Sequence, residues 1–138
     1  MRQALHRFTR STDRKGLFDI TREAERFVAG QGIAAGLLTV FCRHTSASLV
    51  IQENADPTVR SDMERFFERI APEGTHYEHD LEGPDDMPAH LRAALTQPSL
   101  AVPVEGGRML LGTWQAIYLF EHRSRPHRRE IVLHLVGE

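Results

Sequence analysis

Residues 99–136, SLAVPVEGGRMLLGTWQAIYLFEHRSRPHRREIVLHLV, decide the fold of this chain. They contain four short runs rich in strand-forming side chains, and a Glu-Gly-Gly turn separates the first two runs. The predicted strands are 100–104, 109–111, 113–120 and 131–136. Strands gathered near the end of a chain favour a largely antiparallel sheet with helices to one side, and they argue against a doubly wound parallel fold.

Three helices are expected earlier in the chain. The first follows Thr21, and the third opens at Pro88. The second begins at Asp56-Pro57, where a capping carboxylate precedes a proline, and it ends before Pro72. Their predicted inner faces are Ala24, Phe27 and Val28 in the first helix, Val59, Met63, Phe66, Phe67 and Ile70 in the second, and Leu91, Ala94 and Leu95 in the third.

Further strands are expected at 3–9, 36–42 and 48–53, and the last two could pair with each other. The element order is therefore β-α-β-β-α-α-β-β-β-β. It predicts an α+β fold in which a mostly antiparallel or mixed sheet carries helices on one side. At 138 residues and 15.7 kDa, the chain fits one domain that spans residues 1–138.

The single cysteine, Cys42, cannot form an internal disulfide, which fits a reducing compartment. The N-terminal segment carries charge throughout, and no apolar run approaches the ~20 residues that a bilayer requires. We therefore expect a cytoplasmic protein that does not associate with a membrane.

The net charge of −2 is unevenly distributed along the chain. Residues 44–105 hold four basic and twelve acidic side chains, whereas the segments on either side are basic. This acidic segment also contains His44, His76, His79 and His90, so carboxylates and imidazoles are concentrated together. Such groups bind divalent cations such as Zn, Mg or Mn. A nucleic-acid partner is not expected, because the basic run near the C-terminus has no interleaved aromatics and no helix.

The strongest cluster of candidate ligands lies between His79 and His90. Residues 73–87 have no apolar period and predict a loop, which is where binding groups concentrate. Asp86 and His90 are four residues apart and would share one face of the third helix. His79 and Asp80 precede them, while His76 is equally compatible with an exposed loop residue. The cluster predicts a divalent metal site.

A second polar group, HTSAS at 44–48, follows an apolar run. His44 in this position suits a ligand or a base, with hydroxyls beside it, but a plain polar turn is the commoner explanation for such a histidine. A Cys42/His44 nucleophile pair is a further alternative, although residues two apart on a strand share a face without necessarily meeting.

Other polar residues stand near predicted strand ends. Glu53 and Asn54 can face a cleft at a strand-to-helix junction, or can be solvated loop residues. Trp114 is expected in the core, on a kinked strand. Residues 123–129 predict a basic turn whose guanidinium groups suit phosphate, although such runs are usually solvated.

Four stretches in this order resemble the YjbQ family, whose members are also described as secondary thiamine-phosphate synthases. They are HTSAS (44–48), ENADPTV (53–59), HDLEGPDDMPAH (79–90) and SLAVPVEGGRMLLGTWQAIYLFEHR (99–123). The resemblance implies a compact α+β subunit that forms a homotrimer, with polar sites near the subunit boundaries and a metal at the histidines. It draws attention to His44, Thr45, Ser48, Glu53, Asn54, His79, Asp86, His90 and Gln115.

The resemblance also implies a weak synthase activity, which joins a hydroxymethylpyrimidine diphosphate to a thiazole phosphate and releases pyrophosphate. The leading hypothesis is a metal-assisted enzyme acting on a phosphorylated small molecule. In it the metal is held by His44, His79 and His90, Glu53 or Asp86 acts as general acid/base or supports a ligand, and substrate is positioned by Thr45, Ser48, Asn54 and Gln115. The alternatives are a metal-dependent hydrolase of another small substrate and a non-catalytic trimer that holds a metal or an anion.

Overall fold

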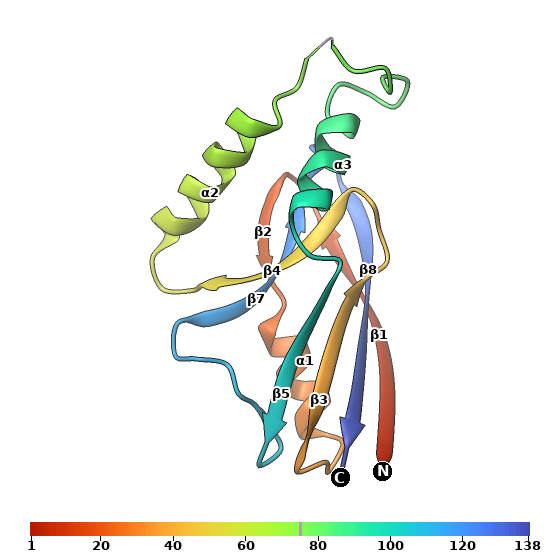
Figure 1. Cartoon of the computed structure of the whole chain (residues 1–138), viewed down its shortest axis with the longest axis vertical. Coiled ribbons are helices and arrows are strands. Elements are labelled where there is room, and N and C mark those ends of the chain that lie inside the picture. The colour runs from red at the N-terminus through yellow and green to blue at the C-terminus, as the bar shows by residue number, and fades with distance from the viewer. Residues whose placement is uncertain (75) are drawn as a thin grey trace.

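Two antiparallel sheets and three helices form this α+β domain in the computed structural model, which describes residues 1–74 and 76–138 (Figure 1). The strands are β1 (Arg2–Thr12), β2 (Gly16–Asp19), β3 (Ala35–Cys42), β4 (Ala47–Glu53), β5 (Ser99–Glu105), β6 (Arg108–Met109), β7 (Gln115–Glu121) and β8 (His127–Gly137). The helices are α1 (Thr21–Ala29), α2 (Pro57–Ile70) and α3 (Asp86–Leu95). None of the helices in the described residues has the length and apolar character needed to cross a bilayer.

The main core lies between the two sheets. One sheet has five strands in the order β1-β8-β3-β5-β6, and the other has three in the order β2-β7-β4. Alternate side chains of the five-stranded sheet, such as Leu38 and Leu133, are fully buried against Leu49 and Leu119 of the three-stranded sheet. Helix α1 contributes Phe27 and Val28 to the same core.

Helix α2 covers the opposite face of the three-stranded sheet. Tyr118 and Phe120 of β7 point to this side and form a smaller core with Phe67 of α2. The rings of Phe67 and Phe120 meet edge-on, with centroids 5.2 Å apart. Strand β7 is consequently buried on both of its faces.

The predicted start of the second helix is confirmed. The Asp56 side chain accepts a hydrogen bond of 2.9 Å from the Thr58 backbone N–H, and Pro57 is the first helical residue. The predicted inner face is only partly correct, because Phe67 is buried whereas Phe66 and Ile70 are exposed. The helix contacts the sheet along a narrower stripe than its apolar pattern indicated.

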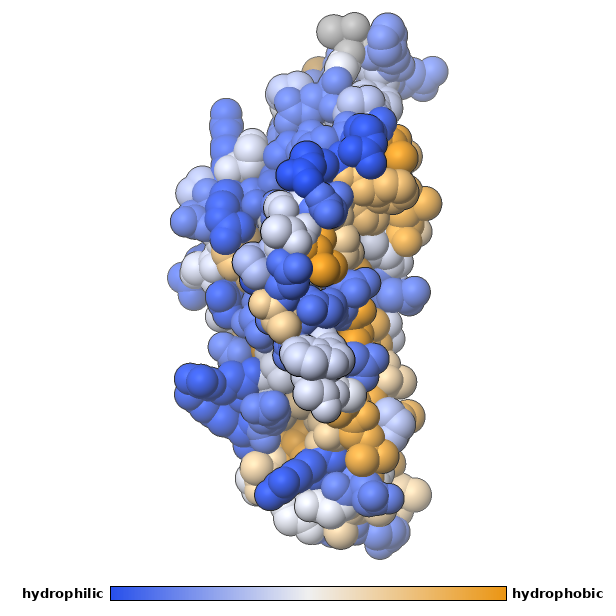
Figure 2. All heavy atoms as spheres, turned by 90° about the vertical axis from the view of Figure 1, so that its left-hand side faces the viewer, coloured by the Kyte–Doolittle hydropathy of each residue, from blue (hydrophilic) through white to orange (hydrophobic). Residues whose placement is uncertain are grey.

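The outer face of the five-stranded sheet has no covering layer in the described residues. Leu5, Leu37 and Phe41 project from this face and are 60%, 47% and 42% exposed. The sheet faces the viewer in Figure 1, and this side of the molecule forms the right-hand edge of Figure 2, along which hydrophobic residues gather. Large contiguous apolar patches on a protein surface commonly mark sites of protein–protein contact.

The prediction of a single sheet was wrong. The strands expected to pair, β3 and β4, belong to different sheets, because the chain crosses from one sheet to the other between them. Strand β2 was missed, since its four residues are too few to show an alternating pattern. Helices α1 and α2 also pack on opposite sides of the three-stranded sheet instead of on one side.

Three local predictions also need correction. Trp114 is 62% exposed and precedes β7, so it is not a core residue. The predicted basic turn is shorter than expected, because β8 already begins at His127 and buries Arg129. The buried residues of α3 are Asp86, Pro88, Ala89 and Arg92, whereas the predicted inner residues Ala94 and Leu95 are exposed.

Strands β3 and β8 approach closely at two glycines. A Cβ atom added to Gly36 would collide with the backbone carbonyl of Val136. We expect Gly36→Ala to lower the free energy of unfolding by about 1 to 3 kcal/mol, as overpacking generally does. Gly30→Ala is the matched control, because its Cβ would be 3.5 Å from the nearest backbone atom, and it should be neutral or stabilise by up to ~1 kcal/mol. Urea unfolding of both variants measures the difference, and equal stabilities would contradict the close approach.

Candidate functional site

Three side chains predicted as site residues converge at the start of α3. The Nε2 atoms of His79 and His90 lie 2.6 and 3.1 Å from the same carboxylate oxygen, Oδ2 of Asp86. One ligand atom from each of the three residues can be chosen so that all lie within 4.8 Å of one another. Asp86 is buried, His90 is partly buried and His79 is exposed, so the group opens to solvent on one side. We call these three residues the His79–Asp86–His90 triad.

The hydrogen bond at the second ring nitrogen of His90, Nδ1, fixes which nitrogen carries a proton. His90 Nδ1 lies 2.9 Å from the backbone carbonyl oxygen of Thr45. A carbonyl oxygen can only accept, so Nδ1 carries a proton. In the neutral imidazole, Nε2 therefore presents its lone pair to the Asp86 carboxylate. Two lone pairs facing each other at 3.1 Å repel, unless a proton or a metal cation lies between them.

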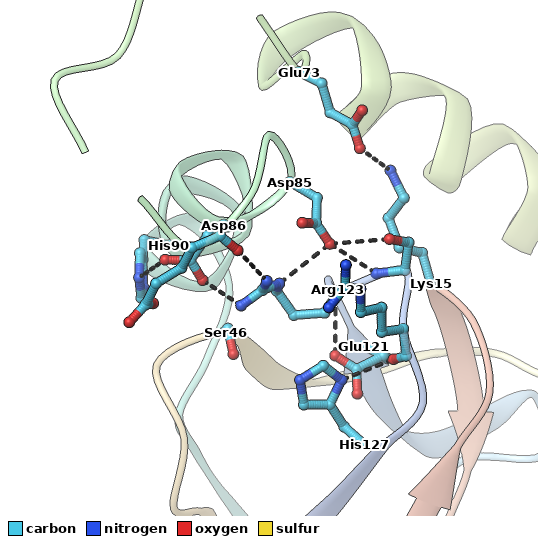
Figure 3. A network of polar contacts seen from close by, with 12 residues as sticks. Lys15, Ser46, Glu73, Asp85, Asp86, His90, Glu121, Arg123 and His127 are labelled. Atoms are coloured by element: carbon cyan, nitrogen blue, oxygen red, sulfur yellow. Dashed lines mark hydrogen bonds and ion pairs between the residues drawn. The ribbon is translucent and has the colours of Figure 1, made fainter. Parts of the chain in front are cut away.

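Arg123 holds the carboxylate of Asp86 from the other side. Its Nη1 donates to Asp86 Oδ1 at 2.6 Å, and its Nε donates to Asp85 Oδ2 at 3.1 Å. The Nη2 atom donates to the backbone carbonyl of Glu82 at 2.8 Å. Figure 3 shows the guanidinium group between Asp85 and Asp86, with His90 beyond Asp86. Arg123 thus fixes the orientation in which Asp86 faces the two histidines.

Both aspartates are held ionised. Burial alone would raise the pKa of Asp85, but hydrogen bonds from the Ser124 backbone and from Arg123 outweigh it and lower the pKa to about 2. Burial is likewise outweighed at Asp86, whose pKa is lowered by the hydrogen bond from His79 and by the charges of His90 and Arg123. An ionised carboxylate between two imidazoles is a suitable ligand for a divalent cation.

His44 does not join this group within one chain. Its Nε2 accepts a hydrogen bond of 2.8 Å from the Glu130 backbone N–H. Burial lowers the pKa of His44, so the ring is neutral and its remaining proton is on Nδ1. Neither nitrogen then offers a free lone pair to a metal. The alternative of a Cys42/His44 nucleophile pair is unsupported, because burial raises the pKa of the Cys42 thiol to about 11.

A buried ion pair supports the segment that carries Arg123. Glu121 and Arg129 form two hydrogen bonds, of 2.7 and 2.5 Å, and both side chains are almost completely buried. The Glu121 carboxylate accepts two further hydrogen bonds, from the Thr12 hydroxyl and from the Arg123 backbone N–H. Arg129 also donates to Ser46. These contacts connect β1, β7 and β8 beneath the triad.

The predicted substrate residue Ser48 is buried. Its hydroxyl lies 2.8 Å from His122 Nε2 and accepts a hydrogen bond of 2.5 Å from Thr96. In this structure the hydroxyl has no path to a ligand at the surface. Thr45, in contrast, takes part through its backbone carbonyl, which positions His90.

The remaining predicted residues, Glu53, Asn54 and Gln115, lie at the other end of β7. Glu53 is paired with Gln115 where β7 begins, whereas Arg123 follows its end. Six residue steps along β7 correspond to about 20 Å. The Glu53 carboxylate accepts hydrogen bonds from the Ala55 and Asp56 backbone, and so caps its own turn.

Asn54 and Gln115 line a cavity of about 910 Å³ beside α1. Val28 and Met109 provide apolar lining. The charged lining is mixed and consists of Arg22, Arg108, Asp19, Glu23 and Glu25. The Gln115 side chain accepts a hydrogen bond of 2.7 Å from the Gly112 backbone N–H. None of the lining residues belongs to the triad, so Asn54 and Gln115 are separate from the triad within one chain.

Sequence reasoning missed Arg123, Glu121 and His122 as parts of this region. The sequence places Arg123 in a basic turn, and no local pattern indicates that it reaches residues almost 40 positions away. The adjacent Asp85-Asp86 pair was the available signal, because two neighbouring buried carboxylates need a cation.

Comparisons with known proteins cover nearly the whole chain. A family model described as UPF0047 protein YjbQ-like matches residues 6–138. The chain belongs to the YjbQ family. A UPF0047 protein of Synechocystis sp. is 51% identical over 129 residues, covering 93% of this chain and 88% of the relative. The UPF0047 protein YjbQ of Salmonella typhimurium is 47% identical over 131 residues, covering 94% and 95%.

Solved structures share the fold. A conserved protein of the YjbQ/UPF0047 family from Clostridium acetobutylicum matches with a TM-score of 0.89 at 32% identity, over 95% of this chain and 99% of that chain. A hypothetical protein from Aeropyrum pernix matches with a TM-score of 0.90 at 32% identity, over 98% and 99%. The resemblance to the YjbQ family seen in the sequence is therefore confirmed.

The buried His122 of this YjbQ-family chain predicts a loss of stability in mild acid. Burial, followed by the charges of Arg92 and Arg129, lowers the pKa of His122 to about 3, from 6.5 in the unfolded chain. Below pH 6.5 the unfolded state binds a proton that the folded state does not. The stabilisation is complete above pH 6.5 and is lost as the pH falls towards 3.

We expect the contribution of His122 to fall by about 2 kcal/mol between pH 7 and pH 5. Urea unfolding at the two pH values measures it, with the chelator EDTA present throughout. His122→Gln should have a smaller pH dependence by that amount, while His76→Gln, an exposed histidine, should behave as the wild type. An unchanged slope in His122→Gln would contradict the assignment.

Proposed function

We propose that this YjbQ-family protein is a metal-assisted enzyme that acts on a phosphorylated small molecule, and that the triad holds a divalent cation such as Zn, Mg or Mn. The observation that carries the proposal is the convergence of two imidazole Nε2 atoms on one ionised carboxylate. The fixed proton on His90 Nδ1 supports it, because the lone pair on Nε2 then faces the carboxylate and can be satisfied by a bound cation as well as by a second proton.

The donor set fits this kind of cation. Two histidines and one carboxylate are three ligands that leave further positions for water or substrate, as in catalytic metal sites. Thr45 and Arg123 orient His90 and Asp86, as partners outside the first ring of ligands usually do. When bound, the cation would stabilise negative charge on phosphate oxygens. Asp86 is in this proposal a ligand, and His44 is not.

Groups of the chain itself surround the triad and would bind the ligand and hold protons there. The exposed side of His79 leaves the triad open to a ligand from solvent. A thiamine-phosphate-synthase type of reaction, as the resemblance implies, remains the proposed chemistry. The roles expected for Glu53, Asn54 and Gln115 in binding substrate concern the distant end of β7, and they stay predictions.

We also propose that the protein is a homotrimer. The uncovered outer face of the five-stranded sheet supports assembly, since Leu5, Leu37 and Phe41 are exposed there. Burying an apolar face of this kind against identical copies would remove it from water.

The metal prediction concerns His90. We expect His90→Ala to lose the bound metal and the turnover while keeping its fold, because one of three ligands is removed. Elemental analysis of untagged protein and circular dichroism measure both properties. His76→Ala is the matched control, since His76 lies in the same connection but outside the triad. Unchanged metal content in His90→Ala would sink the proposal.

The reaction class needs a separate measurement. We expect release of pyrophosphate when a hydroxymethylpyrimidine diphosphate and a thiazole phosphate are supplied together with Mg, Mn or Zn. Release of phosphate or pyrophosphate from one substrate alone would instead indicate the hydrolase. No turnover across a broad panel of phosphate esters, by protein that retains its metal, would leave a metal-binding trimer without catalysis.

The assembly prediction uses two exposed apolar side chains. Light scattering of the wild type should give about three times the chain mass of 15.7 kDa. Leu37→Glu combined with Phe41→Glu should reduce the mass to that of one chain, because the carboxylates would be buried without partners. Leu81→Glu, at a position 96% exposed outside the sheet, is the control and should leave the mass unchanged. A trimer that survives the double substitution would show that another surface holds it together.

A further inference from the structure

A groove runs along α2 on a side that the mechanism above does not use. Two adjoining cavities of about 260 and 350 Å³ share Lys15, Ser61 and Glu64 in their lining. One wall is the face of α2 that carries residues 57, 60, 61, 64, 65 and 68. The other wall comes from the β1–β2 turn, Leu17, Phe120 and Arg92 of α3. We call this space the α2 groove.

The lining of the α2 groove carries a net positive charge, whereas the whole chain carries a net negative charge. The whole chain carries a net charge of −2. The lining of the groove has five cationic side chains against two carboxylates, which leaves three positive charges in excess. The cations are Arg14, Lys15, Arg60, Arg65 and Arg92, and the carboxylates are Glu64 and Glu68.

Two of these cations have no acidic partner among the described residues. Arg14 donates to the backbone carbonyl of Lys15, and Arg60 donates to the neutral hydroxyl of Tyr118 at 3.2 Å. Both cations line the end of the groove next to Pro57. The other cations are paired, Lys15 and Arg92 with Glu68, and Arg65 with Asp62. The positive charge without an ion-pair partner is therefore at Arg14 and Arg60, and it exceeds the charge of Glu64, the one carboxylate at this end of the groove.

Arg92 provides an independent indication at the other end. It is only 3% exposed, and its Nε–H has no hydrogen-bond partner, although its two Nη atoms bond Glu68 and the Ala71 carbonyl. A buried donor without an acceptor is costly, so an acceptor that reached the Arg92 Nε–H from the groove would be bound favourably.

We propose that the α2 groove is a binding site for a small phosphate-bearing anion, separate from the triad. Guanidinium groups suit this ligand because their planar N–H donors match phosphate oxygens in pairs. The volumes of the two cavities fit a small molecule and not a macromolecule. Apolar side chains such as Leu17 and Phe120 would contact the organic part of a phosphate ester.

Inorganic phosphate is the probe for the experiment. An NMR titration of EDTA-treated protein, at constant ionic strength, should give saturable shifts at residues of the α2 groove. Arg14→Gln and Arg60→Gln should each bind phosphate about tenfold or more weakly, because each removes charged hydrogen bonds to the anion. Arg69→Gln is the matched control, since Arg69 is exposed on α2 but does not line the groove, and it should bind as the wild type.

Lys15 offers a second readout because it is the only lysine in the chain. Phosphate should slow acetylation of Lys15, measured by mass spectrometry, without slowing that of the N-terminal amine. The protection should be lost in Arg14→Gln at the same phosphate concentration. No saturation, equal affinity in the wild type and Arg14→Gln, or binding that requires the metal restored to the triad would each overturn the proposal.

Discussion

The burial of β7 on both faces is the constraint from which the rest of the structure follows. One row of its side chains, including Ile117 and Leu119, closes the core between the sheets, and the other row, including Tyr118 and Phe120, supports α2. A strand held in this way cannot shift its register, because a slip of one residue would exchange the two rows. The residues at the C-terminal end of β7 and just after it, Glu121 to Arg123, therefore have a fixed position relative to the core.

This fixed strand end explains why polar groups can be buried beside it. Glu121 is completely buried, yet each of its oxygens accepts two hydrogen bonds, from Arg129, Thr12 and the Arg123 backbone. Removing one partner from such a pair generally costs more than the pair contributes, so its members depend on each other. The Arg123 side chain then extends from this support and orients Asp86 at the triad. The geometry of the candidate metal site therefore depends on the core through the Arg129–Glu121 ion pair, the hydrogen bond from the Arg123 backbone to Glu121, and the Arg123–Asp86 ion pair.

The sequence predicts the helices and strands of this fold better than it predicts which strands pair with one another. Helical spacing and the Asp56-Pro57 cap gave α2 correctly, and the apolar runs gave β3, β4, β5 and β8, because these signals are local. Sheet membership depends on pairing between distant strands, which the pattern does not contain, so one sheet was expected where two exist. The inner face of α3 was misassigned for a related reason. Asp86 and Arg92 are buried there through partners elsewhere in the chain, which residue type alone does not reveal.

The predicted site residues show the same difference between local signals, which the sequence contains, and contacts between distant residues, which it does not. Asp86 and His90 were placed together by their spacing on a helix, and the structure brings His79 to them. Glu53, Asn54 and Gln115 were joined to that group only by resemblance, and about 20 Å of β7 separates them from it. This span exceeds the reach of one small phosphorylated molecule. Within one chain, a single small molecule therefore cannot contact both the triad and the cavity beside α1, and it could reach both only where copies of the chain meet.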